Sequence, residues 1–106
     1  MANGTNASVE KVERVAGAFE EALLKGIRRG LTFSEVGNMA RGYKDVLHDI
    51  SMDSYERDDF ATADVSNAAY ARLTLITDAH FATLTAAHDR AIAATKVSDD
   101  LNSEES

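Results

Sequence analysis

The chain has 106 residues, of which 44% are hydrophobic and 27% are charged, with a formal net charge of −7 and no cysteine. This length and composition are typical of one soluble globular domain, and the lack of cysteine excludes a disulfide framework and thiolate chemistry. The acidity argues against non-specific binding to nucleic acid or to an anionic membrane, and it is compatible with a basic protein partner. The N-terminus has no signal-like apolar stretch and no run approaches a membrane span, so we expect a cytoplasmic protein.

The sequence predicts an all-α fold. It has no proline, every glycine lies at or before Gly42, and no segment alternates strictly between apolar and polar residues. We expect a single helical domain over residues 8–97, between a flexible tail at 1–7 and an acidic flexible tail at 98–106.

The first predicted helix covers residues 8–29. Its apolar stripe is Val9, Val12, Ala16, Phe19, Leu23 and Ile27. Gly30 is placed to end the helix. Gly26 lies on the buried side of the helix, where it either permits the close approach of a neighbour or is simply a destabilising residue.

The second predicted helix covers residues 33–50. Thr32 and Glu35 have the spacing of a capping box, and Leu31 with Val36 has that of a hydrophobic staple. Its one-sided stripe is Val36, Met39, Ala40, Tyr43, Val46, Leu47 and Ile50. The very short connection predicts that the first two helices form an antiparallel hairpin.

Residues 51–63 are acidic and harder to interpret. Asp53 and Glu56 have the spacing of another capping box, so we expect a short helix over residues 54–60. Whether it joins the following helix is left open by the sequence. The acidic residues lack the spacing of a calcium loop and are interpreted as a solvated connection, or else as a patch for a basic partner.

The third predicted helix, residues 64–96, has two apolar seams on different sides. The first seam is Val65, Ala69, Leu73, Ile76, Leu84, Ala87 and Ala91. The second, here called the Ala seam, is Ala68, Ala71, Leu75, Ala79, Ala82, Ala86 and Ala93. The helix would be about 50 Å long, whereas the other two would be about 32 and 27 Å. The hairpin cannot cover it, and a second copy of the chain is the simplest partner, giving a homodimer.

The Ala seam is the predicted protein-interaction surface. Alanine is also a common surface filler on helices, but a filler should scatter, whereas these alanines keep a helical spacing around Leu75. Tyr70 and Phe81 are the predicted anchor residues of the contact.

The sequence contains no catalytic, cofactor or metal motif. His80 and His88 are two helical turns apart and belong to no zinc or di-iron pattern, and His48 lies on the outer face of the second helix. We therefore expect no enzyme activity, no cofactor and no metal. A histidine could also make an interface sensitive to pH, and His80, within the first seam, is the best candidate.

A basic cluster provides the alternative interpretation. Its members, within residues 25–44, are Lys25, Arg28, Arg29, Arg41 and Lys44. They could contact phosphate, as in a nucleic-acid-associated regulator, although a helix-turn-helix spacing is absent and the chain as a whole is acidic.

The sequence thus favours a non-catalytic protein-interaction protein without membrane contact. Such a chain could be an assembly component, or a small acidic helical regulator or inhibitor that occludes a partner surface. The inhibitors and anti-activators of phages and bacteria are the class suggested, by association with small acidic helical proteins and not by derivation.

Overall fold

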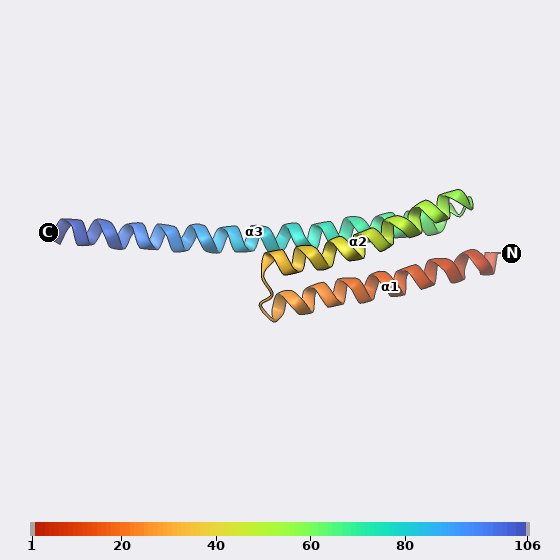
Figure 1. The fold of residues 1–106 in the computed structure, drawn as a ribbon, viewed down its shortest axis with the longest axis horizontal. Helices are drawn as coiled ribbons and strands as arrows, with labels where there is room; N and C mark the ends of the chain where they lie inside the picture. Colours follow the sequence, from red (N-terminus) through yellow and green to blue (C-terminus); the bar gives the residue numbers. More distant parts are fainter. Residues whose placement is uncertain (1, 106) are drawn as a thin grey trace.

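A computed structural model describes residues 2–105 of the chain and the side chains of residues 7–97. It confirms the all-α prediction. The described residues form three helices, α1 (Ala2–Arg28), α2 (Phe33–Glu56) and α3 (Phe60–Glu105). The antiparallel pair α1–α2 packs along the first half of α3, and the second half of α3 projects alone beyond it (Figure 1). The molecule is a rod of 80 × 22 × 18 Å.

The outer ends of α1 and α3 differ from prediction. α1 begins at Ala2 instead of Ser8, and α3 continues to Glu105 instead of Lys96. The physical reason is that neither extension contains a proline, and α3 contains no glycine, so nothing in the backbone ends these helices. The flexible tails predicted at 1–7 and 98–106 lie almost wholly outside the residues whose side chains are described, and their mobility stays a prediction.

The connection between α2 and α3 corrects the prediction of a separate helix over residues 54–60. α2 runs on to Glu56, and Phe60 already belongs to α3. The chain reverses at Asp58, which adopts a positive φ of 60°. The amide of Asp59 donates to the carbonyl of Ser54 (2.8 Å), and that of Asp58 donates to Tyr55 (3.1 Å). These two bonds form a Schellman motif, in which the left-handed position is usually held by glycine.

Asp59 also explains why α3 begins earlier than the predicted Asp64. Its carboxylate accepts hydrogen bonds from the backbone amide of Thr62 (3.2 Å) and from the Thr62 hydroxyl (2.6 Å). An aspartate in this position caps a helix N-terminus, where backbone amides have no partner within the helix. Asp53, which the sequence suggested as a cap, instead forms an ion pair at 2.8 Å with Arg57, the residue that follows α2.

The end of α1 settles the two interpretations of Gly26. Gly30 has a φ of +88°, and the Leu31 amide donates to the Gly26 carbonyl (3.1 Å) in a second Schellman motif. A Cβ added at Gly26 would lie 2.8 Å from Cδ1 of Leu31 and 3.8 Å from the sulfur of Met39. Gly26 therefore permits a close approach, and the neighbour is the Leu31 side chain of the connecting turn.

The predicted capping box of α2 is confirmed. The Glu35 amide donates to the Thr32 hydroxyl oxygen, and the Thr32 amide donates to the Glu35 carboxylate, both at 3.1 Å. The Thr32 amide, with a smaller contribution from the Thr32 side chain, holds the pKa of the Glu35 carboxyl below its ordinary value, because a donated hydrogen bond favours the charged form.

The core lies between the hairpin and the first half of α3. Its buried apolar members are Val12, Ala16, Leu23, Val36, Ala40, Leu47, Ala69 and Leu73. They come from the predicted stripes of α1 and α2 and from the first seam of α3, so these faces were correctly predicted, except that Val46 of the α2 stripe is exposed. Phe19 of α1 stacks on Tyr43 of α2 with ring centroids 4.3 Å apart.

Small residues let α2 and α3 approach closely near their connection. The buried members of this contact are Ser51, Ser54, Thr62, Ala63 and Ser66. The Ser66 hydroxyl donates to the backbone carbonyl of Leu47 across the two helices. Further along, Arg72 of α3 pairs with Glu20 of α1. This pair shows which turn of α1 lies level with which turn of α3.

Candidate functional site

The Ala seam runs along an exposed side of α3, where Leu75 and Ala79 border a groove against α1. All seven of its residues are exposed, and Leu75 leaves 66% of its surface open to solvent. Apolar surface that stays exposed on a folded chain is available to a partner. The structure therefore leaves this predicted interaction surface uncovered over the residues described, and what covers it stays a prediction.

The two predicted anchor residues, by contrast, face α2. Phe81 packs against Phe33, with ring centroids 5.0 Å apart, and keeps 53% of its surface exposed. The Lys44 ammonium lies 5.0 Å from the centre of the Tyr70 ring, a cation–π contact. Both rings are thus already engaged within the chain, and Phe81 is the more exposed of the two.

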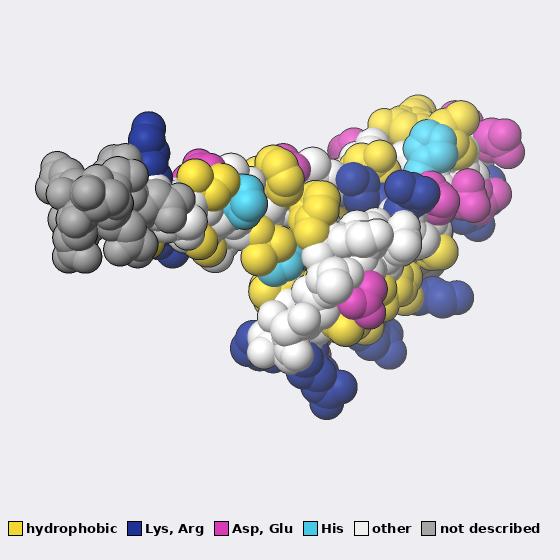
Figure 2. All heavy atoms as spheres, turned by 60° about the vertical axis from the view of Figure 1, so that its left-hand side comes forward, with side chains coloured by type: hydrophobic (Ala, Val, Ile, Leu, Met, Phe, Trp, Pro, Cys, Tyr) yellow, Lys and Arg dark blue, Asp and Glu magenta, His cyan; other side chains and the backbone are white. Residues whose placement is uncertain are grey.

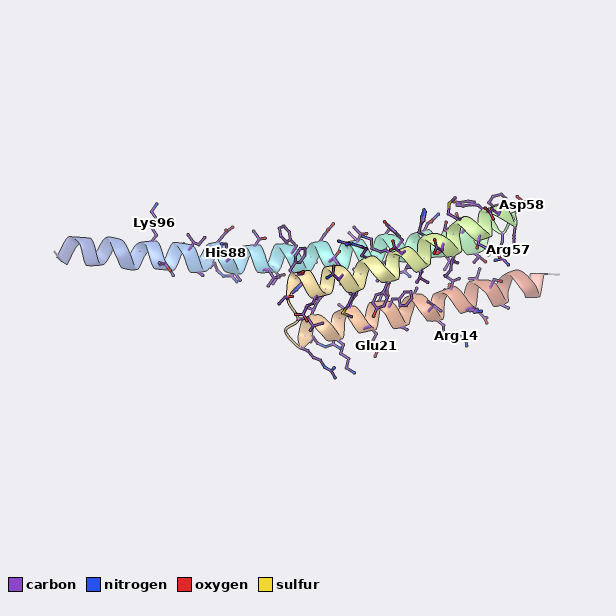
Figure 3. All side chains as sticks on the ribbon, in the orientation of Figure 1. Arg14, Glu21, Arg57, Asp58, His88 and Lys96 are labelled. Atoms are coloured by element: carbon purple, nitrogen blue, oxygen red, sulfur yellow. The ribbon has the colours of Figure 1, made fainter. Side chains whose placement is uncertain are left out.

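The second half of α3 is the most exposed part of the described chain. We call residues 60–81 the bundled segment and residues 82–105 the projecting segment. Every residue from 81 to 97 is exposed, and hydrophobic side chains and histidines gather on α3 just beyond the hairpin (Figure 2). Where the projecting segment leaves the hairpin, an apolar groove of about 230 Å³ is lined by Phe33, Phe81, Leu84, Thr85 and His88. His88 and Lys96 are seen along the projecting segment in Figure 3.

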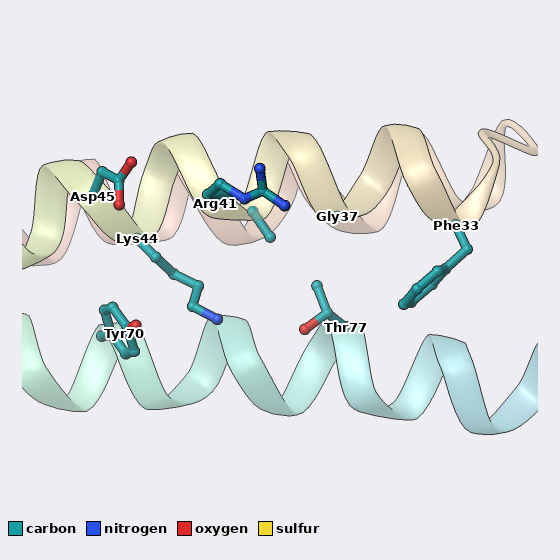
Figure 4. A pocket seen from close by; sticks show the side chains of 8 residues that line it. Phe33, Gly37, Arg41, Lys44, Asp45, Tyr70 and Thr77 are labelled. Atoms are coloured by element: carbon teal, nitrogen blue, oxygen red, sulfur yellow. The ribbon is translucent and has the colours of Figure 1, made fainter.

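The basic cluster is divided between two places. Lys25, Arg28 and Arg29 are exposed at the C-terminal end of α1, which we call the basic tip. Arg41 and Lys44 line a groove of about 290 Å³ between α2 and α3, together with Asp45 (Figure 4). None of the three α1 residues lines this groove. The five cations are therefore not gathered in this one groove, and contact with phosphate stays a prediction.

The histidines lie apart from one another. His48 and His88 are exposed, whereas His80 is half-buried, and its Nε2 has no hydrogen-bond partner in the described structure. His80 contributes to a shallow apolar groove of about 390 Å³ between α1 and α3, lined also by Leu24, Ile27, Leu75, Ile76, Ala79 and Thr83. In the part of the chain that the structure describes, no group of three or more His, Asp or Glu side chains could hold a metal ion.

The acidic residues of the connection have structural roles that the sequence interpretation missed. Asp59 caps α3, and Asp53 pairs with Arg57. A threonine three residues after an aspartate, followed by an apolar helical pattern, was the available signal for Asp59 as a cap. The Arg72–Glu20 pair joins residues far apart in sequence, so no local pattern could have shown it.

Among residues 2–105, no helix combines the length and the apolar character that crossing a membrane requires. Comparison with protein-family models, with curated proteins and with solved structures found no match for this chain.

Proposed function

We propose that this chain is a non-catalytic interaction protein that acts through α3, as an assembly component or as a small acidic regulator that occludes a surface of its partner. The observation that carries the proposal is the Ala seam: seven residues at helical spacing, all exposed, with Leu75 the most open large apolar side chain. Such a seam on a rigid helix can be buried by a partner helix without any rearrangement of the chain.

The shape of α3 supports the same proposal. The projecting segment, about 36 Å long at 1.5 Å per residue, extends beyond α1 and α2 over most of its length (Figure 1). Most of the stability of a helix in a protein comes from tertiary packing of one of its faces. Burying its apolar surface against another protein would stabilise it, so association gives the projecting segment a physical role.

Inhibition is the form of action that we favour for the seam. A narrow face of small side chains can cover part of a partner's surface without providing a pocket for a substrate. The chain would then be of the inhibitor or anti-activator class, working inside the bacterial or phage-infected cell. Its negative charge suits a basic partner surface.

The test is a photo-crosslinking experiment in the cell that naturally makes the chain. A photoreactive residue at Ala82 or Ala86 should give one discrete covalent adduct, which mass spectrometry identifies. The same residue at Glu13, on the exposed side of α1, should not give it. Leu75→Glu should abolish the adduct while circular dichroism stays helical, because a charge would then have to be buried. Equal adducts from Ala82 and Glu13 would contradict a role for the seam.

Nucleic-acid binding is the competing proposal and has less support, because the cations are divided between the basic tip and the α2–α3 groove. Retention on DNA that falls steeply with salt, and that is lost in Arg41→Ala, would favour it over the interaction proposal.

A further inference from the structure

The first seam of α3 continues beyond the hairpin. Leu73 is fully buried and Ile76 packs against the core. The same three- and four-residue steps then lead through His80 to Leu84, Ala87, Ala91 and Ala94, which are exposed. Residues at this spacing stay on one side of a helix. The face that the hairpin covers in the bundled segment is therefore the face left uncovered in the projecting segment.

We propose that a second copy of the chain covers this face, with the two projecting segments packed antiparallel. This deepens the proposed function, on which it rests, by naming one partner of α3. It also assigns the second copy to the continuation of the first seam and leaves the Ala seam free for a different protein.

The seam is self-complementary in one antiparallel register. With the two-fold axis between Ile92 and Ala93, Ala91 of one copy lies opposite Ala94 of the other. The next pairs outward are Ala87 with Ser98 and Leu84 with Leu101, which follow at the same spacing in the sequence. A two-fold interface requires this reciprocity, and small residues near the axis allow the helices to pack closely.

The position of the hairpin fits the same register. The contact between Phe33 and Phe81 marks the point where the hairpin ends along α3. With Leu84 level with residue 101 of the other copy, the antiparallel contact begins just beyond this point, beside the apolar groove that Leu84 lines.

The charges at the two ends of the molecule favour the antiparallel orientation. The last residues of the chain carry Asp99, Asp100, Glu104 and Glu105, while the basic tip carries Lys25, Arg28 and Arg29. Antiparallel packing in this register brings each acidic end to the basic tip of the other copy. In a parallel pair the basic tips of the two copies would lie beside each other, and so would the two acidic ends. Both contacts would be repulsive.

Pairing through the Ala seam lacks the contact between the acidic end and the basic tip. An antiparallel arrangement centred on Ala86 matches Ala79 with Ala93, but it places the acidic end level with Arg72 and Glu20, away from the basic tip.

The first test is the mass of the full chain by sedimentation equilibrium. We expect a dimer of the 11.4 kDa chain. Ala94→Glu should raise the dissociation constant at least about tenfold, because each copy would bury an unpaired carboxylate near the axis. Ala93→Glu is the matched control: it adds the same charge at an equally exposed alanine on the Ala seam, and the dimer should persist. A monomer at high concentration, or equal effects of the two substitutions, would overturn the proposal.

A charge exchange tests the contact between tip and end. Arg28→Glu with Arg29→Glu should weaken the dimer, and so should Asp99→Lys with Asp100→Lys. All four substitutions in one chain should restore it, since the opposite charges face each other again. If the two double variants weaken the dimer and the fourfold variant does not restore it, the contact between the basic tip and the acidic end is contradicted.

Orientation is tested with spin labels, for which the chain offers no competing cysteine. Labels at Ala94→Cys should lie within about 15 Å of each other, whereas labels at Asp78→Cys should be about 45 Å apart along the axis. Two short distances would show a parallel dimer and overturn the proposal. Loss of the Ala82 photo-adduct with an intact dimer would contradict only the proposed function, so the two failures are distinguishable.

Discussion

The two halves of α3 have similar apolar spacing but different surroundings. In the bundled segment, Ala69 and Leu73 are fully buried beneath the hairpin, whereas in the projecting segment Leu84, Ala87 and Ala91 are exposed. The spacing shows which residues share a face, and the length of the hairpin decides how far that face is covered. A helix can therefore carry one continuous seam of which the chain itself buries only part.

The strongest test of this difference truncates a leucine in each half. Leu73→Ala should lower the free energy of unfolding by about 2–5 kcal/mol, because it leaves a cavity in the core. Leu84→Ala should lower it much less in the monomer, because Leu84 is 39% exposed and its packing is limited to the groove beside Phe33 and Phe81. Urea unfolding followed by circular dichroism at low protein concentration measures both. Equal losses would mean that the projecting segment is packed in solution.

The start of α2 gives an effect of intermediate size. Thr32→Ala should cost about 1 kcal/mol, since it removes one acceptor of the capping box. Thr83→Ala is the control on the projecting segment, where the hydroxyl only donates to the Ala79 carbonyl of its own helix. We expect thermal unfolding to separate the two variants, and an unchanged midpoint for Thr32→Ala would show that the box does not stabilise the bundle.

Asp58 allows a substitution that stabilises the bundled half. Its left-handed backbone favours glycine, so Asp58→Gly should add about 0.5–1 kcal/mol to the free energy of unfolding. The same replacement at the exposed helical Asp49 should be neutral or slightly destabilising. Chemical denaturation of both variants tests this, and a loss of stability in Asp58→Gly would mean that the aspartate side chain matters more than its backbone.

The smallest expected effect is a change in the stability that the capping box contributes at acidic pH. The pKa of Glu35 is lowered in the folded chain by its hydrogen bonds with Thr32, so the capping box contributes fully above the ordinary glutamate pKa. That contribution fades as the pH falls through the ordinary value and then through the lowered one. The difference in melting temperature between the parent chain and Glu35→Gln should therefore shrink on acidification. A difference that grows toward low pH would contradict the sign.

Much of the hairpin could be predicted from the sequence. The Thr32 box depends on residues three apart, and the stripes of α1 and α2 depend on helical spacing, so local patterns suffice. Gly30 likewise marked the end of α1 because glycine is the residue that the left-handed position favours.

The connection between α2 and α3 was harder to predict, because the residue that reverses the chain there is not a glycine. Asp58 occupies a left-handed position without being glycine, so the reversal had no clear signal. Asp53 and Asp59 both resemble caps locally, and only the position of the reversal decides which one meets free amides. For the candidate site, the seams could be predicted, but the engagement of Tyr70 by Lys44 could not, because it depends on how α2 lies against α3.

The 80 Å length of this small chain affects how its size is measured. A rod experiences more friction than a sphere of equal mass, so even a single copy should leave a gel-filtration column early, with the Stokes radius of a heavier protein. Elution volume would then report elongation as if it were self-association, whereas methods that weigh particles independently of shape would separate the two.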